Sequence, residues 1–252
     1  MKRLVPLSGA AVSLLLILPL LPLIFRSIAH GWRFPDLWPQ QFSLRAWAFA
    51  FSSGAGTGPA LAETVIIALM VALISVVVAL PPAQLIGQHN FRGKGLLLAL
   101  IALPLLLPPF AALMGLHGLF ARLHLTGTRT GVILAHLIPA LPYAIFILAA
   151  LFARLDRGYV AQARSLGASP WQAFVRVTLP MIRPGLMLAF ALTFLVSWGQ
   201  YALTLMIGGG RVETLPLLLF STLSAGRNDL TGALGLIYIL PGLIILALTV
   251  RK

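Results

Sequence analysis

Residues 61–83 read LAETVIIALMVALISVVVALPPA, an apolar run that only Glu63, Thr64 and Ser75 interrupt with polar side chains. A helix that crosses a membrane needs roughly 20 mainly apolar residues, and this run is long enough. Its apolar residues follow one another and do not alternate with polar ones, unlike the strands of a membrane β-barrel. Because a helix satisfies its backbone hydrogen bonds internally, the run predicts a membrane-spanning helix.

The composition of the whole chain supports the same fold class. Of the 252 residues, 60% are hydrophobic and 9% are charged, whereas a soluble domain carries about 25% charged residues. A chain this apolar has too few polar residues to cover a water-facing surface. We therefore expect an all-α, polytopic membrane protein that forms a single domain over residues 1–252.

The apolar runs predict about six transmembrane helices. They cover residues 8–27, 61–83, 96–120, 131–153, 184–207 and 231–250. The first run follows Met1-Lys2-Arg3 like a signal peptide, but no small-x-small cleavage site follows, so we expect a retained helix. Prolines such as Pro104 and Pro139 should bend the third and fourth spans, either to line a path or to fit neighbouring helices.

Charge predicts the orientation in the membrane. The formal net charge is +13, and eleven of the 18 Lys and Arg fall on the side that holds both termini. Cytoplasmic loops carry the excess of basic residues. We therefore expect both termini in the cytoplasm, with the Trp-rich stretch 28–59 outside. No basic stripe is interleaved with aromatic residues, so we expect no nucleic-acid partner.

The sequence does not indicate chemistry by the chain itself. It has no cysteine, which excludes thiol chemistry and disulfides. No glycine-rich loop ends in Gly-Lys-Ser/Thr, and no Ser-His-Asp set or metal-binding pair of histidine and carboxylate stands out. We expect no catalytic residue, no metal site and no cofactor in this chain.

A few polar residues within the predicted spans are candidates to contact a solute. They are Tyr143 in the fourth span and Trp198, Gln200 and Tyr201 in the fifth. Such side chains either face a path or form packing contacts and hydrogen bonds between helices. For His117 and His136 we favour a hydrogen bond between helices over a position facing a cavity.

The loop between the fourth and fifth spans, residues 154–183, is predicted to begin with a short helix. Residues 158–166 can be helical. Gly167 then provides the left-handed residue that commonly closes a helix.

A second short helix is predicted to follow directly. Ser169 is a good N-cap, Pro170 fits the first helical position, and Gln172 completes a capping box. Pro180 is expected to limit its length.

This second helix carries an apolar face. Trp171, Phe174 and Val175 fall on one side of it. That face either lies against the ends of this chain's own spans or docks a partner, and the pattern alone leaves both open.

The spacing in this loop resembles the EAA motif of permeases in binding-protein-dependent ABC importers. That motif runs Glu-Ala-Ala, three residues, Gly, nine residues, Ile, one residue, Leu-Pro. Ala163, Gly167, Val177 and Leu179-Pro180 stand at the matching positions.

Other residues of the loop extend the resemblance or depart from it. The segment 166–171, Leu-Gly-Ala-Ser-Pro-Trp, is typical of the family, and Asp156 stands where members often carry an acid. The leading Glu of the motif is Ala161 here, and its first Ala is Gln162. The charged contact that the family's Glu makes with the ATPase is therefore in question for this chain.

The resemblance extends from about residue 61 to 250. The stretch 192–222, with Gly208-Gly209-Gly210 and Thr214-Leu215-Pro216, looks like permeases of the polyamine, ferric iron, thiamine and phosphonate group.

The resemblance implies the partners and the location of the chain. It implies a permease in the bacterial inner membrane that pairs with a second permease subunit within the lipid bilayer. The pair could be homomeric or heteromeric, and the replacement of the leading Glu by Ala161 favours a heteromeric pair. The resemblance implies two copies of an ATP-binding subunit, which would hold ATP and Mg, and a solute-binding protein outside. It also implies that the loop couples to the ATPase through Ala161, Gln162, Ala163, Gly167, Ser169, Pro170, Trp171, Phe174, Leu179 and Pro180.

The alternative is a stand-alone secondary transporter or channel. Ion-coupled transporters usually need acids within their spans. All five acids of this chain lie outside the spans or at their ends, and Glu63 is the nearest to the membrane.

Overall fold

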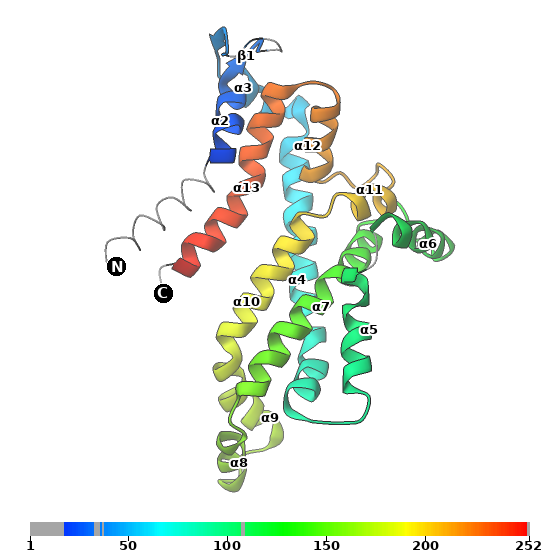
Figure 1. Cartoon of the computed structure of the whole chain (residues 1–252), viewed down its shortest axis with the longest axis vertical. Coiled ribbons are helices and arrows are strands. Elements are labelled where there is room, and N and C mark those ends of the chain that lie inside the picture. Colours follow the sequence, from blue (N-terminus) through cyan, green and yellow to red (C-terminus); the bar gives the residue numbers. More distant parts are fainter. Residues whose placement is uncertain (1–17, 33–35, 37, 107–108, 251–252) are drawn as a thin grey trace, which may run out of the picture. The chain divides into compact units, whose positions relative to one another are not determined.

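The structure, a computed structural model, describes residues 18–32, 36, 38–106 and 109–250. The chain divides into two compact units (Figure 1), one of residues 1–63 and 213–252 and one of residues 64–212. Residues 8–17 of the first predicted span, 8–27, lie outside the described residues, and residues 18–27 belong to η1 and α2. The ends of the chain, to which the predicted orientation refers, also lie outside them.

The first unit is made of short elements and one long helix. Its elements are η1 (Leu18–Leu20), α2 (Leu21–Ile28), β1 (Ala29–His30), β2 (Gln41–Phe42), α3 (Arg45–Ala50), η2 (Ser53–Ala55), the start of α4 (Thr57–Gln88), α12 (Leu215–Ser224) and α13 (Asn228–Val250). The two strands pair antiparallel, with Ala29 opposite Phe42.

Glycines let α13 approach α2 closely in this unit. A Cβ at Gly232 would stand 2.7 Å from the backbone nitrogen of Ser27, and one at Gly235 would stand 3.2 Å from Leu23. Small residues at such positions are typical of helices that pack within membranes. A hydrogen bond of 3.2 Å from Thr231 Oγ1 to Thr222 Oγ1 joins α13 to α12.

The regular elements among the described residues of the second unit are all helices. This unit holds the rest of α4, then α5 (Lys94–Leu106), α6 (Pro109–Arg122), α7 (Arg129–Arg154), α8 (Arg157–Ser165), α9 (Pro170–Ala173), the π-helical η3 (Phe174–Thr178), α10 (Leu179–Trp198) and α11 (Ala202–Gly208).

Two apolar clusters form the core of the second unit. In one, α4, α7 and α10 meet through small and large residues such as Ala83, Leu148 and Ile182, each fully buried. In the other, α4, α6, α7 and α11 meet around Val71 and Ile207.

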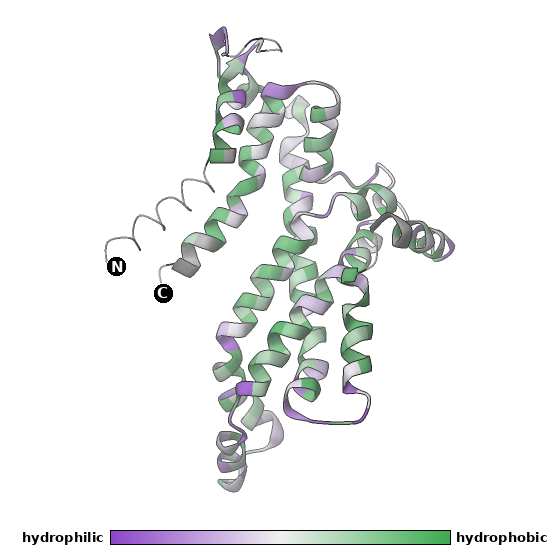
Figure 2. Ribbon diagram, in the orientation of Figure 1, coloured by the Kyte–Doolittle hydropathy of each residue, from purple (hydrophilic) through white to green (hydrophobic). Residues whose placement is uncertain are grey.

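Four helical stretches among the described residues are long and apolar enough to cross a membrane. They are Thr57–Gln88, Arg129–Arg154, Pro170–Trp198 and Asn228–Ile245. Figure 2 shows hydrophobic residues along the middle of α4, α7 and α10 and hydrophilic residues near their ends. The predicted helical, polytopic fold is confirmed, and the spans predicted at 61–83, 131–153 and 231–250 correspond to α4, α7 and α13.

One predicted span is not a single helix. The run 184–207 divides into α10 and α11, with a break at residues 199–201. The run 96–120 holds α5 and α6 on either side of residues 107–108, which lie outside the described residues. Hydropathy did not reveal the break at 199–201, because three residues between two apolar stretches lower the mean hydropathy of the whole run only slightly.

The prediction that Pro180 ends the short helix of the loop is wrong. The helix that begins at Pro170 continues through η3 into α10 and ends only at Trp198. In η3 the backbone N–H of Leu179 donates to the carbonyl of Phe174, five residues earlier. This π-helical turn interrupts the regular i→i−4 pattern of hydrogen bonds directly before Pro180, and the helix continues past the proline.

Candidate functional site

Capping interactions define both ends of α8. Asp156 is its N-cap, and Oδ1 accepts a hydrogen bond of 2.8 Å from the Gly158 N–H. At the other end Gly167 has a φ of +87°. Its N–H donates to the Arg164 carbonyl at 3.0 Å, and the Ala168 N–H donates to the Ala163 carbonyl at 3.1 Å. This pair of bonds is a Schellman motif, so the helix end predicted at Gly167 is confirmed.

The capping box that starts α9 is present. The Gln172 N–H donates to Ser169 Oγ at 3.2 Å, and the Ser169 N–H donates to Gln172 Oε1 at 2.9 Å. Pro170 occupies the first turn. Two caps within a few residues therefore fix the chain between α8 and α9 by local bonds.

An apolar surface projects from this turn. Trp171 is 71% exposed and Leu166 is 88% exposed. The Trp171 ring stacks on Phe174, with centroids 5.9 Å apart and planes inclined by 28°. A large exposed aromatic side chain is typical of an interaction site. Of the two interpretations that the sequence left open, the exposure of Trp171 favours a docked partner.

The remaining residues of the motif flank this surface. Ala161 and Gln162 are exposed on α8, where they line a shallow hollow together with Gly158, Ser165 and Leu166. Ala163 and Leu179 are half-buried, and Pro180 is exposed.

The second unit also has a partly open cavity of about 440 Å³. Its described lining residues are Pro104, Leu105, Leu113, Leu116, Ile138, Pro139, Tyr143, Val196, Gly199, Gln200, Ala202 and Leu203. They come from α5, α6, α7, α10, α11 and the break between the last two. Among these described residues only Tyr143 and Gln200 have polar side chains.

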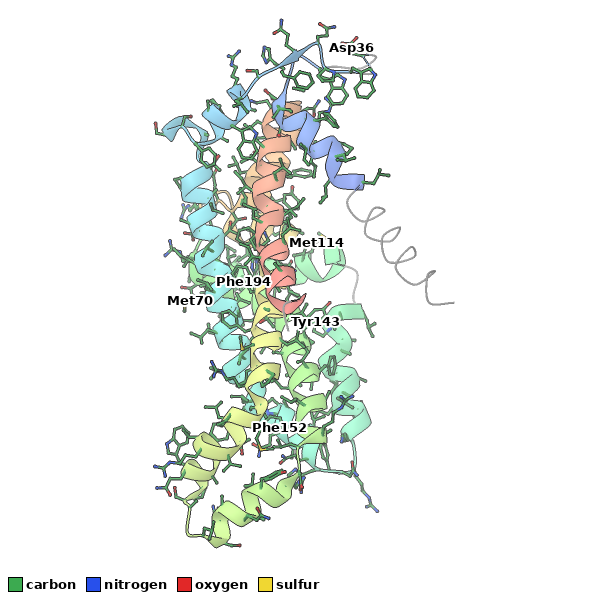
Figure 3. The ribbon with its side chains drawn as sticks, turned by 90° about the vertical axis from the view of Figure 1, so that its left-hand side faces the viewer. Asp36, Met70, Met114, Tyr143, Phe152 and Phe194 are labelled. Atoms are coloured by element: carbon green, nitrogen blue, oxygen red, sulfur yellow. The ribbon has the colours of Figure 1, made fainter. Side chains whose placement is uncertain are left out.

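Of the four polar residues that the sequence indicated as candidates for solute contact, two line the cavity. Tyr143, on α7 (Figure 3), and Gln200 both line the cavity. Trp198 is 4% exposed and stacks on Phe194, with centroids 5.7 Å apart. Tyr201 is half-buried in the break. Trp198 and Tyr201 are not among the described lining residues.

Two prolines noted in the sequence, Pro104 and Pro139, also line the cavity. Of their two predicted roles, lining a path is the one that this position supports. The small and aliphatic residues of the lining, such as Leu113 and Ala202, carried no signal that sequence reasoning could use.

Both histidines within the helices form hydrogen bonds between helices, as predicted. His117 Nδ1 lies 2.9 Å from the Met206 carbonyl oxygen. His136 contacts Ser197 and Thr204, each at 2.9 Å. Over residues 18–32, 36, 38–106 and 109–250 no group of three or more His, Asp or Glu gathers to hold a metal ion.

Comparison with known proteins yields one family and several relatives. The model of a family described as binding-protein-dependent transport system inner membrane component matches residues 79–251. The probable molybdenum ABC transporter permease protein of Haloferax volcanii is 34% identical over 175 residues. These residues are 66% of this chain and 65% of that protein, so the chain spans slightly less than two thirds of this relative.

Two solved structures share the fold. One is a bacterial ABC transporter involved in the import of the acidic polysaccharide alginate, with a TM-score of 0.74, 17% identity, and coverage of 100% of this chain and 97% of that chain. The other is a bacterial alginate ABC transporter in complex with a periplasmic protein bound to alginate pentasaccharide. Its TM-score is 0.66 at 15% identity, over 97% of this chain and 91% of that chain.

Proposed function

Since this chain belongs to the family of binding-protein-dependent transport system inner membrane components, we propose that it is the membrane-spanning permease subunit of an ATP-driven solute importer. The proposal places it in a bacterial inner membrane with both termini in the cytoplasm. The Haloferax relative and the solved transporters name different cargoes, molybdenum and alginate. The proposal therefore concerns the role of the chain and leaves the cargo unassigned.

The observation that carries the proposal is the exposed Trp171, which stacks on the half-buried Phe174 beside a turn fixed by two caps. Trp171 is 71% exposed although it is among the largest apolar side chains of the chain. A partner that covers it gains the free energy of burying this apolar area. At this position of the EAA motif the partner is a separate ATP-binding subunit, present in two copies, which supplies the ATP and Mg sites.

The continuous helix from Pro170 to Trp198 supports a mechanical coupling to the cavity. Its first turns carry Trp171 and Phe174, and its last residues, with the break that follows, reach Gly199 and Gln200 at the cavity. Movement of an ATPase against the exposed face would be transmitted along one helix to the lining of the cavity. A ligand or ATP shifts such a system only by binding one of two conformations more tightly.

The cavity forms part of the solute path under this proposal. Tyr143 and Gln200 would contact the solute there, while Trp198 and Tyr201 would support the helix and the break beside it. A second permease subunit would complete the path, and a solute-binding protein outside would deliver the solute. A complex with such a periplasmic protein is described for the solved alginate transporter.

Co-purification tests the proposal directly. The tagged full chain is extracted from its native membrane in mild detergent, and the proteins that accompany it are identified by mass spectrometry. We expect an ATPase with a Gly-rich nucleotide loop, and we expect its loss when Trp171 and Phe174 are both changed to Asp. Trp38→Asp is the matched control, since Trp38 is 73% exposed and lies in the stretch predicted to be outside.

Two results would count against the proposal. If the chain purifies without an ATPase and the Asp substitutions have no effect, a stand-alone transporter or channel becomes the better explanation. If Trp38→Asp removes the ATPase as completely as the double substitution, the docking surface has been assigned to the wrong residues.

A further inference from the structure

His136 is the centre of a buried polar chain that joins three helices of the second unit. The residue is 1% exposed. Its Nδ1 lies 2.9 Å from Ser197 Oγ of α10, and its Nε2 lies 2.9 Å from Thr204 Oγ1 of α11. Apolar side chains of the adjoining core cluster surround this part of α7. A hydrogen bond lost in such surroundings leaves a buried polar group without a partner, which is costly.

The donors and acceptors of this chain follow from one further bond. Thr204 Oγ1 lies 2.8 Å from the Gln200 carbonyl oxygen, which can only accept. The single hydroxyl proton of Thr204 is therefore donated to Gln200, so Thr204 accepts from His136 Nε2–H. A neutral imidazole has one N–H, and Nδ1 therefore accepts from the Ser197 hydroxyl. The order is Ser197 to His136 to Thr204 to the Gln200 carbonyl.

This chain of bonds spans the break between α10 and α11. Ser197 precedes the break and Thr204 follows it, and His136 reaches both from α7. Gly199 and Gln200, which lie within the break, line the cavity. The imidazole thus links the two helix ends whose relative position determines where Gln200 stands.

We propose that His136 is a positioning residue that fixes the break at 199–201 and so presents the Gln200 side chain to the cavity. It does not line the cavity itself. The proposal rests on the proposed function only in treating the cavity as part of the solute path. The predicted effect is a local one, at Gln200, and not a general loss of stability.

The absence of cysteine from the sequence makes a direct test possible. An introduced cysteine is then the only thiol of this chain, and labelling is read on this chain after its separation from the other subunits. Gln200→Cys keeps the backbone carbonyl to which Thr204 donates, and Ile138→Cys reports on the cavity from α7. Labelling rates with N-ethylmaleimide are measured at each position in the full chain, purified in mild detergent with its accompanying subunits, with and without His136→Leu.

We expect His136→Leu to change the rate at position 200 by about fivefold or more, the size that loss of one hydrogen bond gives. The rate at position 138 should stay within about twofold under the same principle. Thr204→Val should reproduce the effect at 200, because it removes the last link of the same chain. His136→Gln should restore the rate, since an amide can both accept from Ser197 and donate to Thr204.

Leu148→Ala is the control for a merely structural effect. Leu148 is fully buried on the same helix, but it belongs to the other core cluster. It should lower stability and leave the rate at position 200 unchanged. An unchanged rate at 200 in His136→Leu, or an equal change in Leu148→Ala, would overturn the proposal. The labelling reaction needs no solute and no ATP hydrolysis, and it is compared between variants purified in the same way, so its outcome can be told apart from that of the co-purification test.

Discussion

Gly87 of α4 lies directly against Phe152 of α7. A Cβ at position 87 would stand 2.7 Å from the Cβ of Phe152 and 2.5 Å from the carbonyl oxygen of Ala149. Phe152 is 1% exposed and belongs to the cluster in which α4, α7 and α10 meet. The glycine therefore sets how closely the C-terminal ends of α4 and α7 approach.

Gly87→Ala should destabilise the protein by about 1–3 kcal/mol, because the added methyl group meets backbone atoms that cannot move aside. The measurement is the midpoint of thermal unfolding of the purified chain in detergent. Gly95→Ala is the control, since nothing lies within 4 Å of a Cβ at Gly95 in α5. Equal midpoints for the two variants would show that the close approach of α4 and α7 at Gly87 does not limit the stability of the protein.

Gly167→Ala should weaken the turn between α8 and α9. The φ of +87° at Gly167 is strained for a residue with a Cβ, and no atom lies within 4 Å of that Cβ, so the cost of about 1 kcal/mol comes from the backbone alone. We expect less ATPase to co-purify. Gly167→Asn should retain more, because Asn adopts the left-handed conformation more readily. The reverse ranking of Ala and Asn would contradict this explanation.

Ser169→Ala should loosen the start of α9 by about 1 kcal/mol, since it removes the acceptor for the Gln172 N–H. Hydrogen exchange measures the loosening directly, and the backbone N–H of Gln172 should exchange about fivefold faster. Ser169→Thr keeps the hydroxyl, so the Gln172 N–H should exchange in this variant at the same rate as in the natural sequence. If Ser169→Ala exchanges no faster, the cap does not stabilise this turn.

Ala161→Glu should strengthen association with the ATPase. Ala161 is exposed on α8, so the longer side chain has room, and it restores the acid of the motif. We expect a higher ATPase yield in co-purification, by about twofold to fivefold for an exposed charge pair. Ala161→Gln has the same length without the charge and is the control. If Ala161→Gln raises the ATPase yield equally, the gain comes from contact area and not from charge.

The turn between α8 and α9 could be predicted residue by residue because its bonds are local. Gly167, Ser169 and Gln172 each interact with groups only a few residues away, and the same short-range rules apply in any fold. Pro180 shows where local rules fail. A proline is expected to end a helix, but the π-helical turn at 174–178 lets the helix continue into α10.

The cavity could be predicted only in part. Tyr143 and Gln200 were identified from their polarity, and both line it. Trp198 was a candidate for the same reason, but its buried ring stacks on Phe194. Polarity shows that a side chain needs a suitable environment, but the rotation of each helix about its axis decides which environment it receives.

By itself, the sequence determined the membrane location, the helical class, most of the long spans and the capped turn. Those features depend on the length of apolar runs and on hydrogen bonds between near neighbours. The tertiary structure alone decided where the apolar runs break, that Trp171 is left exposed, and that His136 meets Ser197 and Thr204. These features depend on contacts between residues far apart in the chain, and packing of whole helices sets them.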